Sequence, residues 1–160
     1  MAEYHLAQLN IAKSKADMDD PLMAGFADNL DRINALAEQS EGFQWRLKDD
    51  SGNATNIDVF MDPRVLINLS VWDSLESLQA FVYQTEHAEF LKRRKQWFLK
   101  LDKMHTVLWW VPAGHQPTTT EALQRLTRLR RDGDGPQAFS FRQTFSASEA
   151  KNPGASTNLP

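Results

Sequence analysis

The sequence has no cysteine and no long apolar run. Without cysteine the protein has no disulfide, no thiolate metal ligand and no cysteine nucleophile. No apolar run approaches the roughly 20 residues of a membrane-spanning helix, so no membrane association is expected. The amino-terminal residues lack the basic-then-apolar pattern of a secretion signal, and we therefore expect a cytoplasmic location.

Several catalytic and binding motifs are also missing. The sequence has no HExxH motif and no histidine pair at helical spacing, which predicts no metal site. It has no glycine-rich phosphate loop and no GxSxG motif, which argues against nucleotide binding and against a hydrolase. The formal net charge is −3, and acidic residues balance the basic runs LKRRKQ and RLTRLRR, so nucleic acid is not an expected partner. We expect no cofactor. Arg94, in the first basic run, either reaches a pocket mouth or lies on a solvated helix face.

The apolar periodicity predicts a single α+β domain over residues 1–146. The expected strands are residues 4–12, 43–47, 65–72 and 105–111. One helical segment begins after an aspartate cap near residue 20 and ends at Gly42. A second runs from about residue 74 to 101, with a break near Gln84. The order β-α-β-β-α-β predicts a ferredoxin-like antiparallel sheet.

Four further segments lie outside this pattern. Residues 48–64 are rich in Asp, Asn, Ser and Gly and are expected to form a loop. Residues 118–131 have leucines at three-residue steps and predict an extra helix. The stretch PQAFSFRQTF predicts a short strand or a loop. Residues 147–160 are small and polar, and we expect a disordered tail.

Two adjacent tryptophans, Trp109 and Trp110, end the fourth strand. Neighbouring residues on a strand point to opposite faces of the sheet, so the two indoles enter different environments. A ferredoxin-like sheet carries helices on one face only. We therefore expect the second indole to face the sheet of a partner subunit in a homodimer. The alternative is that the extra helix covers the second face within one chain.

Five segments of the chain resemble an uncharacterised bacterial family, DUF3291: LAQLNIA, NLDRINALAEQSEGFQWRL, NLSVWDSLESLQAFVY, HAEFLKRRKQWF and WWVPAGHQPTTTEALQRL. The resemblance covers about residues 4–145. It implies membership of the dimeric α+β barrel superfamily, which also contains the antibiotic-biosynthesis monooxygenases. It implies no activity, because none is established for this family.

The wider superfamily offers two comparisons. Anthrone-type monooxygenases, which use O₂ without metal or flavin, carry an asparagine and a tryptophan four residues apart on the third strand. Asn68 and Trp72 are similar in spacing, and residues four apart on a strand share a face. In the haem-degrading relatives an axial histidine falls near Leu91 of this chain. His87 lies one turn earlier, so haem binding is a third alternative.

Asn68 and His87 are the candidate catalytic residues. Asn68 stands in the apolar run VLINLSVW, where an amide is costly unless it is hydrogen-bonded. It either orients a ligand carbonyl and stabilises an enolate oxygen, or makes a structural bond to a neighbouring loop. His87 is expected on a helix under the sheet, as a general base near neutral pH or as a capping or surface histidine.

The candidate binding residues are Trp45, Trp72, Trp110 and His115. The tryptophans are expected to exclude water and stack on a ligand, and the alternative for Trp72 is a place in the core under the second helix. His115 follows Pro-Ala-Gly in a loop, where it either contacts a ligand or bonds to the start of the next helix. The sequence thus predicts a homodimer that binds a small apolar or aromatic molecule, as a cofactor-independent monooxygenase or isomerase. The alternative is a non-catalytic binding or structural module.

Overall fold

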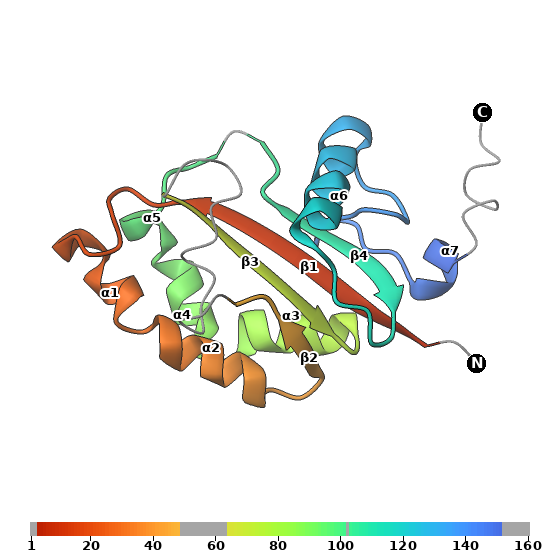
Figure 1. Ribbon diagram of the computed structural model, residues 1–160, viewed down its shortest axis with the longest axis horizontal. Helices are drawn as coiled ribbons and strands as arrows, with labels where there is room; N and C mark the ends of the chain where they lie inside the picture. The colour runs from red at the N-terminus through yellow and green to blue at the C-terminus, as the bar shows by residue number, and fades with distance from the viewer. Residues whose placement is uncertain (1–2, 49–63, 102, 152–160) are drawn as a thin grey trace.

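The computed structural model describes residues 3–48, 64–101 and 103–151, which form one antiparallel sheet with helices on both faces (Figure 1). The sheet has four strands in the order β2-β3-β1-β4. The strands are β1 (Tyr4–Lys13), β2 (Phe43–Arg46), β3 (Val65–Trp72) and β4 (Thr106–Pro112). Helices separate β1 from β2 and β3 from β4, so this is the ferredoxin-like order. The predicted fold class is confirmed.

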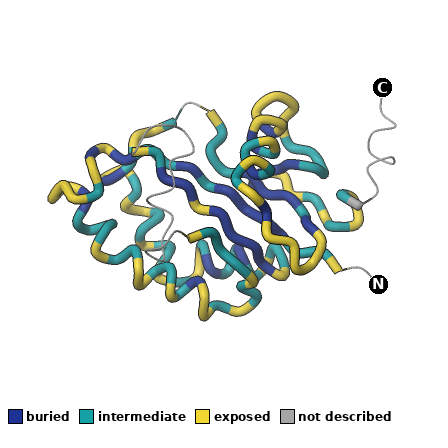
Figure 2. The backbone as a smooth tube through the Cα atoms, in the orientation of Figure 1, coloured by how far each residue is buried: buried dark blue, intermediate teal, exposed yellow. Residues whose placement is uncertain are grey.

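Alternation along the strands sends apolar side chains into two different cores. One face of the sheet carries Leu9 and Trp109 and lies under α6 (Thr119–Asp132), which contacts β4 and β1. The opposite face carries Leu6 and Trp72 and packs against the helices that connect the strands. Figure 2 shows buried residues along β1, β3 and β4. Both faces of the sheet are therefore covered by the same chain.

The two tryptophans that end β4 are accommodated within one subunit. Trp109 is 0% exposed, and its Nε1–H donates to Oε2 of Glu121 in α6 at 2.9 Å. Trp110 lies on the other face, where its Nε1–H donates to the carbonyl oxygen of Phe145 at 2.8 Å. The prediction that one indole faces a partner's sheet is therefore wrong, because α6 of the same chain covers that face.

The segment between β1 and β2 forms three short helices where the sequence predicts one. They are a 3₁₀ helix (Pro21–Met23), α1 (Ala24–Ala27) and α2 (Leu30–Gln39). Asp20 caps the first of them, because its carboxylate accepts the backbone N–H of Leu22 at 2.9 Å. Asn29 separates α1 from α2, and its side-chain Nδ2 donates to the carbonyl oxygen of Gly25 at 2.9 Å. Such a side-chain bond to the backbone competes with regular helix geometry.

The segment between β3 and β4 is also divided. It contains α3 (Leu75–Gln84), α4 (His87–Lys92) and α5 (Arg94–Trp97). Ser74 caps α3 by accepting the backbone N–H of Ser77 at 3.1 Å. The break near Gln84 is confirmed, and it occurs at Thr85, which has extended backbone angles. The Thr85 hydroxyl accepts the backbone N–H of His87 at 3.2 Å, so this turn fixes the start of α4.

The chain after α6 returns to the outer edge of β4. Phe139 pairs with Leu108 through two backbone hydrogen bonds of 2.7 and 2.9 Å, as an isolated bridge and not as a regular strand. A short helix, α7 (Ala147–Lys151), follows, which corrects the prediction of a disordered tail from residue 147. Residues 152–160 of that tail and 49–63 of the predicted loop lie outside the described residues. Within the described ranges, no helix has the length and apolar character needed to cross a membrane.

Candidate functional site

A cavity of about 360 Å³ lies between the sheet and the helices that connect its strands. Its sheet side is formed by residues of β1 and β3 that include Gln8, Asn68 and Trp72. Its helical side includes Phe81 from α3 and His87 from α4. The cavity thus brings together three of the predicted site residues, which are Asn68, Trp72 and His87.

Asn68 belongs to a polar row that crosses β1 and β3. It lies opposite Asn10 in the strand register and is exposed, whereas the residues on either side of it in β3 are buried. The side-chain Nε2 of Gln8 donates to Oδ1 of Asn68 and, at 2.8 Å, to Oγ of Ser70. Among the described residues, the partner of Asn68 is therefore Gln8 of the neighbouring strand β1. Its oxygen is engaged, and its amide nitrogen is a hydrogen-bond donor on the cavity lining.

Trp72 is both a wall of the cavity and part of the core under α3. It is 1% exposed, stacks on Phe81 with ring centroids 5.2 Å apart, and meets Phe43 edge-on at 5.5 Å. Its Nε1–H donates to Oγ of Ser70 at 3.0 Å. The sequence offered two interpretations of Trp72, a pocket wall or core under the second helix. They are compatible, because the same side chain serves as both.

His87 is the first residue of α4, and its ring packs against Phe81 with centroids 4.9 Å apart. Its Nδ1 lies 3.1 Å from the carbonyl oxygen of Val82. A carbonyl oxygen only accepts, so Nδ1 carries the hydrogen and Nε2 of the neutral ring keeps its lone pair. Burial lowers the pKa of His87 below its ordinary value of 6.5, and the bond to Val82 partly offsets this. His87 is therefore a neutral base at pH 7.

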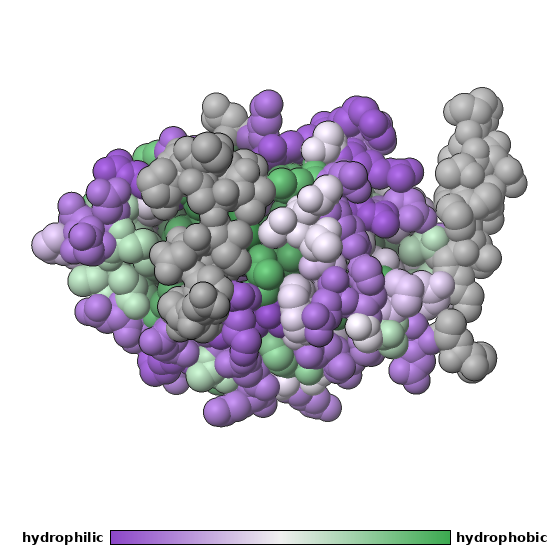
Figure 3. Space-filling view, in the orientation of Figure 1, coloured by the Kyte–Doolittle hydropathy of each residue, from purple (hydrophilic) through white to green (hydrophobic). Residues whose placement is uncertain are grey.

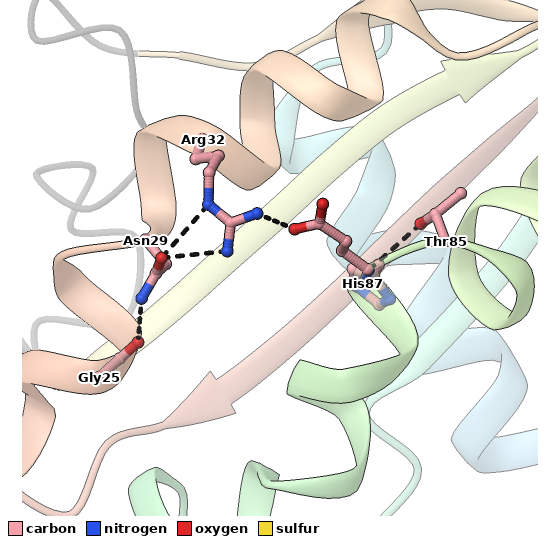
Figure 4. Close-up of polar contacts among 6 residues, drawn as sticks. Gly25, Asn29, Arg32, Thr85 and His87 are labelled. Carbon is pink, nitrogen blue, oxygen red and sulfur yellow. Dashed lines mark hydrogen bonds and ion pairs between the residues drawn. The ribbon is translucent and has the colours of Figure 1, made fainter.

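A polar cluster beside His87 joins the α1–α2 junction to the α3–α4 junction (Figure 4). Arg32 forms an ion pair with Glu86, and its Nη2 donates to Oδ1 of Asn29 at 3.1 Å. Since Glu86 directly precedes His87, the ion pair links the start of α4 to α2. Both charged side chains are more than half exposed, so the pair contributes at most about 1 kcal/mol. Its effect is on the position of α4 more than on overall stability.

Arg46 is a cavity residue that strand alternation places on the outer side of β2. The register of β2 against β3 shifts between Phe43 and Trp45, as in a β-bulge. Phe43 and Arg46 consequently both line the cavity, while Trp45 packs toward α6. The Arg46 side chain is only 10% exposed, and its Nε lies 3.7 Å from Oε2 of Glu38. The signal in the sequence that could have identified Arg46 is an arginine directly after Trp45 in a predicted half-buried strand.

Three predicted binding residues do not line this cavity. Trp45 packs against the core under α6, on the far side of the sheet. Trp110 packs on the cavity side of the sheet but against the carboxy-terminal segment that includes Phe145. His115 is exposed before α6, with Nε2 2.7 Å from Oε1 of Glu121. Their assignment to one pocket with Asn68 is corrected, because the bulge turns Trp45 away and the extra segments occupy the other two.

The chain is similar in fold to solved structures at low sequence identity. A protein of unknown function from Nitrosomonas europaea has 14% identity and a TM-score of 0.45, over 72% of this chain and 94% of that chain. SnoaB, a cofactor-independent oxygenase from Streptomyces nogalater, has 10% identity and a TM-score of 0.44, over 70% and 95%. A candidate antibiotic biosynthesis monooxygenase from Nitrosomonas europaea also has 10% identity and a TM-score of 0.44, over 72% and 92%. No curated protein matches the chain.

The family comparison covers nearly the whole sequence. The family described as "Domain of unknown function (DUF3291)" matches residues 5–155. That range includes every residue that lines the cavity. The chain belongs to the DUF3291 family.

Proposed function

We propose that the cavity binds a small, largely apolar or aromatic molecule. The observation that carries this proposal is that Asn68, Trp72 and His87, which are separated in the sequence, line one cavity of about 360 Å³. A site of this size, with apolar walls and a few polar groups, is typical of small-molecule binding. Free volume beside Asn68 favours a ligand site over a purely structural module.

The chemistry that these groups support is proton abstraction without a cofactor. Nε2 of His87 would remove a proton from a carbon next to a carbonyl, and the electron pair would move onto the carbonyl oxygen. The amide N–H of Asn68 would stabilise the resulting enolate. Return of the proton to a different carbon completes an isomerisation, whereas oxygenation requires O₂ as the oxidant of the enolate. Trp72 and Phe81 would exclude water from the reacting atoms.

The alternative is a protein that holds the same molecule and does not convert it. The cavity, its polar row and the neutral His87 would then serve recognition only. Conversion of the bound molecule by the wild-type protein separates the two functions, because a binding protein returns it unchanged.

We also propose that the protein is a homodimer. Among the described residues, five hydrophobic side chains at the margin of the core under α6 remain only partly buried: Trp45, Leu47, Leu101, Met104 and Leu123. Figure 3 shows hydrophobic side chains at the surface over the sheet, beside α6. A second copy would remove this apolar surface from water, and α6 would then form part of the interface.

Native mass spectrometry of freshly purified protein tests both parts of the proposal. The expected result is a doubled mass with a retained small molecule, which then becomes the assay substrate. We expect His87→Asn and Asn68→Ala each to reduce turnover by about a hundredfold or more, since a general base and an oxyanion donor have effects of this order. His115→Asn, which lies outside the cavity, is the matched control and should keep wild-type turnover. Unchanged turnover in both cavity variants would contradict the mechanism.

A further inference from the structure

The polar row on the cavity lining is joined together by Gln8 of β1. The Gln8 side chain is 7% exposed and lies opposite Ser70 in the strand register, one residue pair away from Asn68 on the same face. A buried amide is costly unless its groups are hydrogen-bonded. Nε2 of Gln8 donates to Oδ1 of Asn68 and, at 2.8 Å, to Oγ of Ser70. An amide nitrogen carries two hydrogens, so both hydrogens of Gln8 are committed to this row.

A backbone carbonyl fixes which end of the Gln8 amide faces β3. Nε2 of Gln8 lies 3.4 Å from the backbone oxygen of Asn68, and a carbonyl oxygen only accepts. The Gln8 oxygen in that place would set one acceptor against another. Oγ of Ser70 also accepts the indole N–H of Trp72 at 3.0 Å, so the same hydroxyl oxygen joins Gln8 to the aromatic wall of the cavity.

The orientation of Asn68 follows from that of Gln8. With Oδ1 of Asn68 bound to Gln8, the nitrogen of the same planar amide is directed away from Gln8, and Asn68 lies on the cavity lining. Asn68 is exposed, whereas Gln8 is buried, so packing holds the Gln8 amide more firmly than the Asn68 amide. The terminal torsion of asparagine is broad and nearly two-fold, so without Gln8 the Asn68 amide could turn over.

The two orientations of Asn68 have opposite effects on a ligand with a carbonyl group. The Asn68 N–H donates to a carbonyl or enolate oxygen, whereas the turned amide would present its own oxygen to that atom. A net hydrogen bond changes affinity by about fivefold. The residue that sets the orientation of Asn68 therefore also sets how strongly the cavity favours an oxygen acceptor.

We infer that Gln8 is a positioning residue, which holds the Asn68 oxygen on the sheet so that the cavity presents an N–H to a carbonyl compound. The inference rests on the proposed function, because it concerns the ligand that the cavity binds. It adds the residue that gives the site its preference for a carbonyl oxygen.

A pair of probes with and without a carbonyl oxygen tests the inference. 2-Acetylnaphthalene and 2-isopropenylnaphthalene have nearly the same shape, and the second carries CH₂ in place of the carbonyl oxygen of the first. Equilibrium dialysis against the full-length protein gives both affinities, and their ratio reports the contribution of the oxygen. Gln8→Met keeps the side-chain length but has no N–H. We expect it to lower the ratio of ketone to alkene affinity about fivefold, because only the ketone uses the Asn68 N–H.

Two further variants assign the effect to the row. Asn68→Asp keeps an oxygen for Gln8 to bind but has no N–H, so it should lower the ratio by a similar factor or more. Gln44→Met makes the same substitution as Gln8→Met at an exposed position of β2 that does not line the cavity. This control should keep the wild-type ratio.

Hydrogen exchange of the side-chain amides, followed by NMR, tests the orientation in the wild-type protein and decides the question even if Gln8→Met does not fold. The N–H groups of Gln8 should exchange slowly, because they are buried and hydrogen-bonded. Those of Asn68 should exchange rapidly, because the residue is exposed. Slow exchange at Asn68 with rapid exchange at Gln8 would overturn the assigned orientation.

The outcomes separate this inference from the proposal that it extends. A wild-type ratio in Gln8→Met, or an equal loss of affinity for both probes, overturns the positioning role of Gln8 and leaves cavity binding intact. If neither probe binds the wild-type protein, the proposed binding function fails and the inference fails with it.

Discussion

His87 is a half-buried histidine whose protonation links the stability of the fold to the pH of the solution. Its folded pKa is lowered by burial, whereas in the unfolded chain it titrates near 6.5. Between the folded pKa and 6.5 the unfolded chain binds more protons, so the free energy of unfolding decreases as the pH falls through this window. Above 6.5 the His87 contribution is fully present.

The substitution His87→Asn keeps a side-chain N–H near the Val82 carbonyl but cannot titrate. We therefore expect the loss of unfolding free energy from about pH 8 to about pH 5.5 to be smaller in His87→Asn than in the wild type. Urea denaturation at each pH measures it. His105, whose pKa is also lowered by burial, titrates in both proteins, so the difference reports on His87. Equal losses in the two proteins would mean that His87 is not held neutral by the fold.

Cavity residues could be predicted from the sequence only on strands whose side chains alternate regularly between the two faces of the sheet. Asn68 and Trp72 lie in β3, whose bounds agree with the predicted strand, so their common face followed from their spacing. Arg46 could not be placed in this way, because one bulge in β2 exchanges the two faces of the strand between Phe43 and Trp45. A bulge depends on pairing with β3, which is a tertiary contact that a four-residue pattern does not contain.

At the scale of elements, α6 packs on the sheet through apolar side chains and is also hydrogen-bonded to it through the Glu121 carboxylate. Oε2 of Glu121 accepts the indole N–H of Trp109 at 2.9 Å, and Oε1 lies 2.7 Å from Nε2 of His115. Trp109 is fully buried, so loss of the acceptor would leave an unsatisfied N–H in the core. Such a group costs about 1–3 kcal/mol.

We accordingly expect Glu121→Ala to lower the free energy of unfolding by about 1–3 kcal/mol. Gln124→Ala, at an exposed position of the same helix, is the control and should change it by less than about 0.5 kcal/mol. Both values come from urea denaturation followed by tryptophan fluorescence. A Glu121→Ala protein as stable as the control would show that the Trp109 bond does not hold α6 on the sheet.

The elements themselves were predicted better than their boundaries. Strand order, the extra helix and the break near Gln84 followed from periodicity and turn residues. The division of the first helical segment did not, because the bond from Asn29 to Gly25 leaves the spacing of apolar residues unchanged. The position of Phe139 beside Leu108 was also missed, since a single bridge has no period.

At the scale of the whole molecule, one chain covers both faces of its sheet and also builds the entire described lining of the cavity. Burial of Trp109 and Trp110 therefore gives no reason for a partner. The reason that remains is the partly exposed apolar margin of the core under α6, which includes Leu123. The proposed dimer interface and the proposed ligand site thus lie on opposite sides of the sheet, so mutations can test them separately.

We expect the wild-type protein to be a dimer in native mass spectrometry and Leu123→Asp to raise its dissociation constant about tenfold or more, because a buried interface would leave the new charge unpaired. Gln124→Asp, one residue further along α6 and exposed, should remain a dimer. Because no described cavity residue lies on α6, the Leu123→Asp monomer should retain the same small molecule as the wild type. A monomeric wild type would contradict the homodimer and leave the cavity untouched. A Leu123→Asp monomer that has lost the retained molecule would show that the partner subunit supports the site from across the sheet.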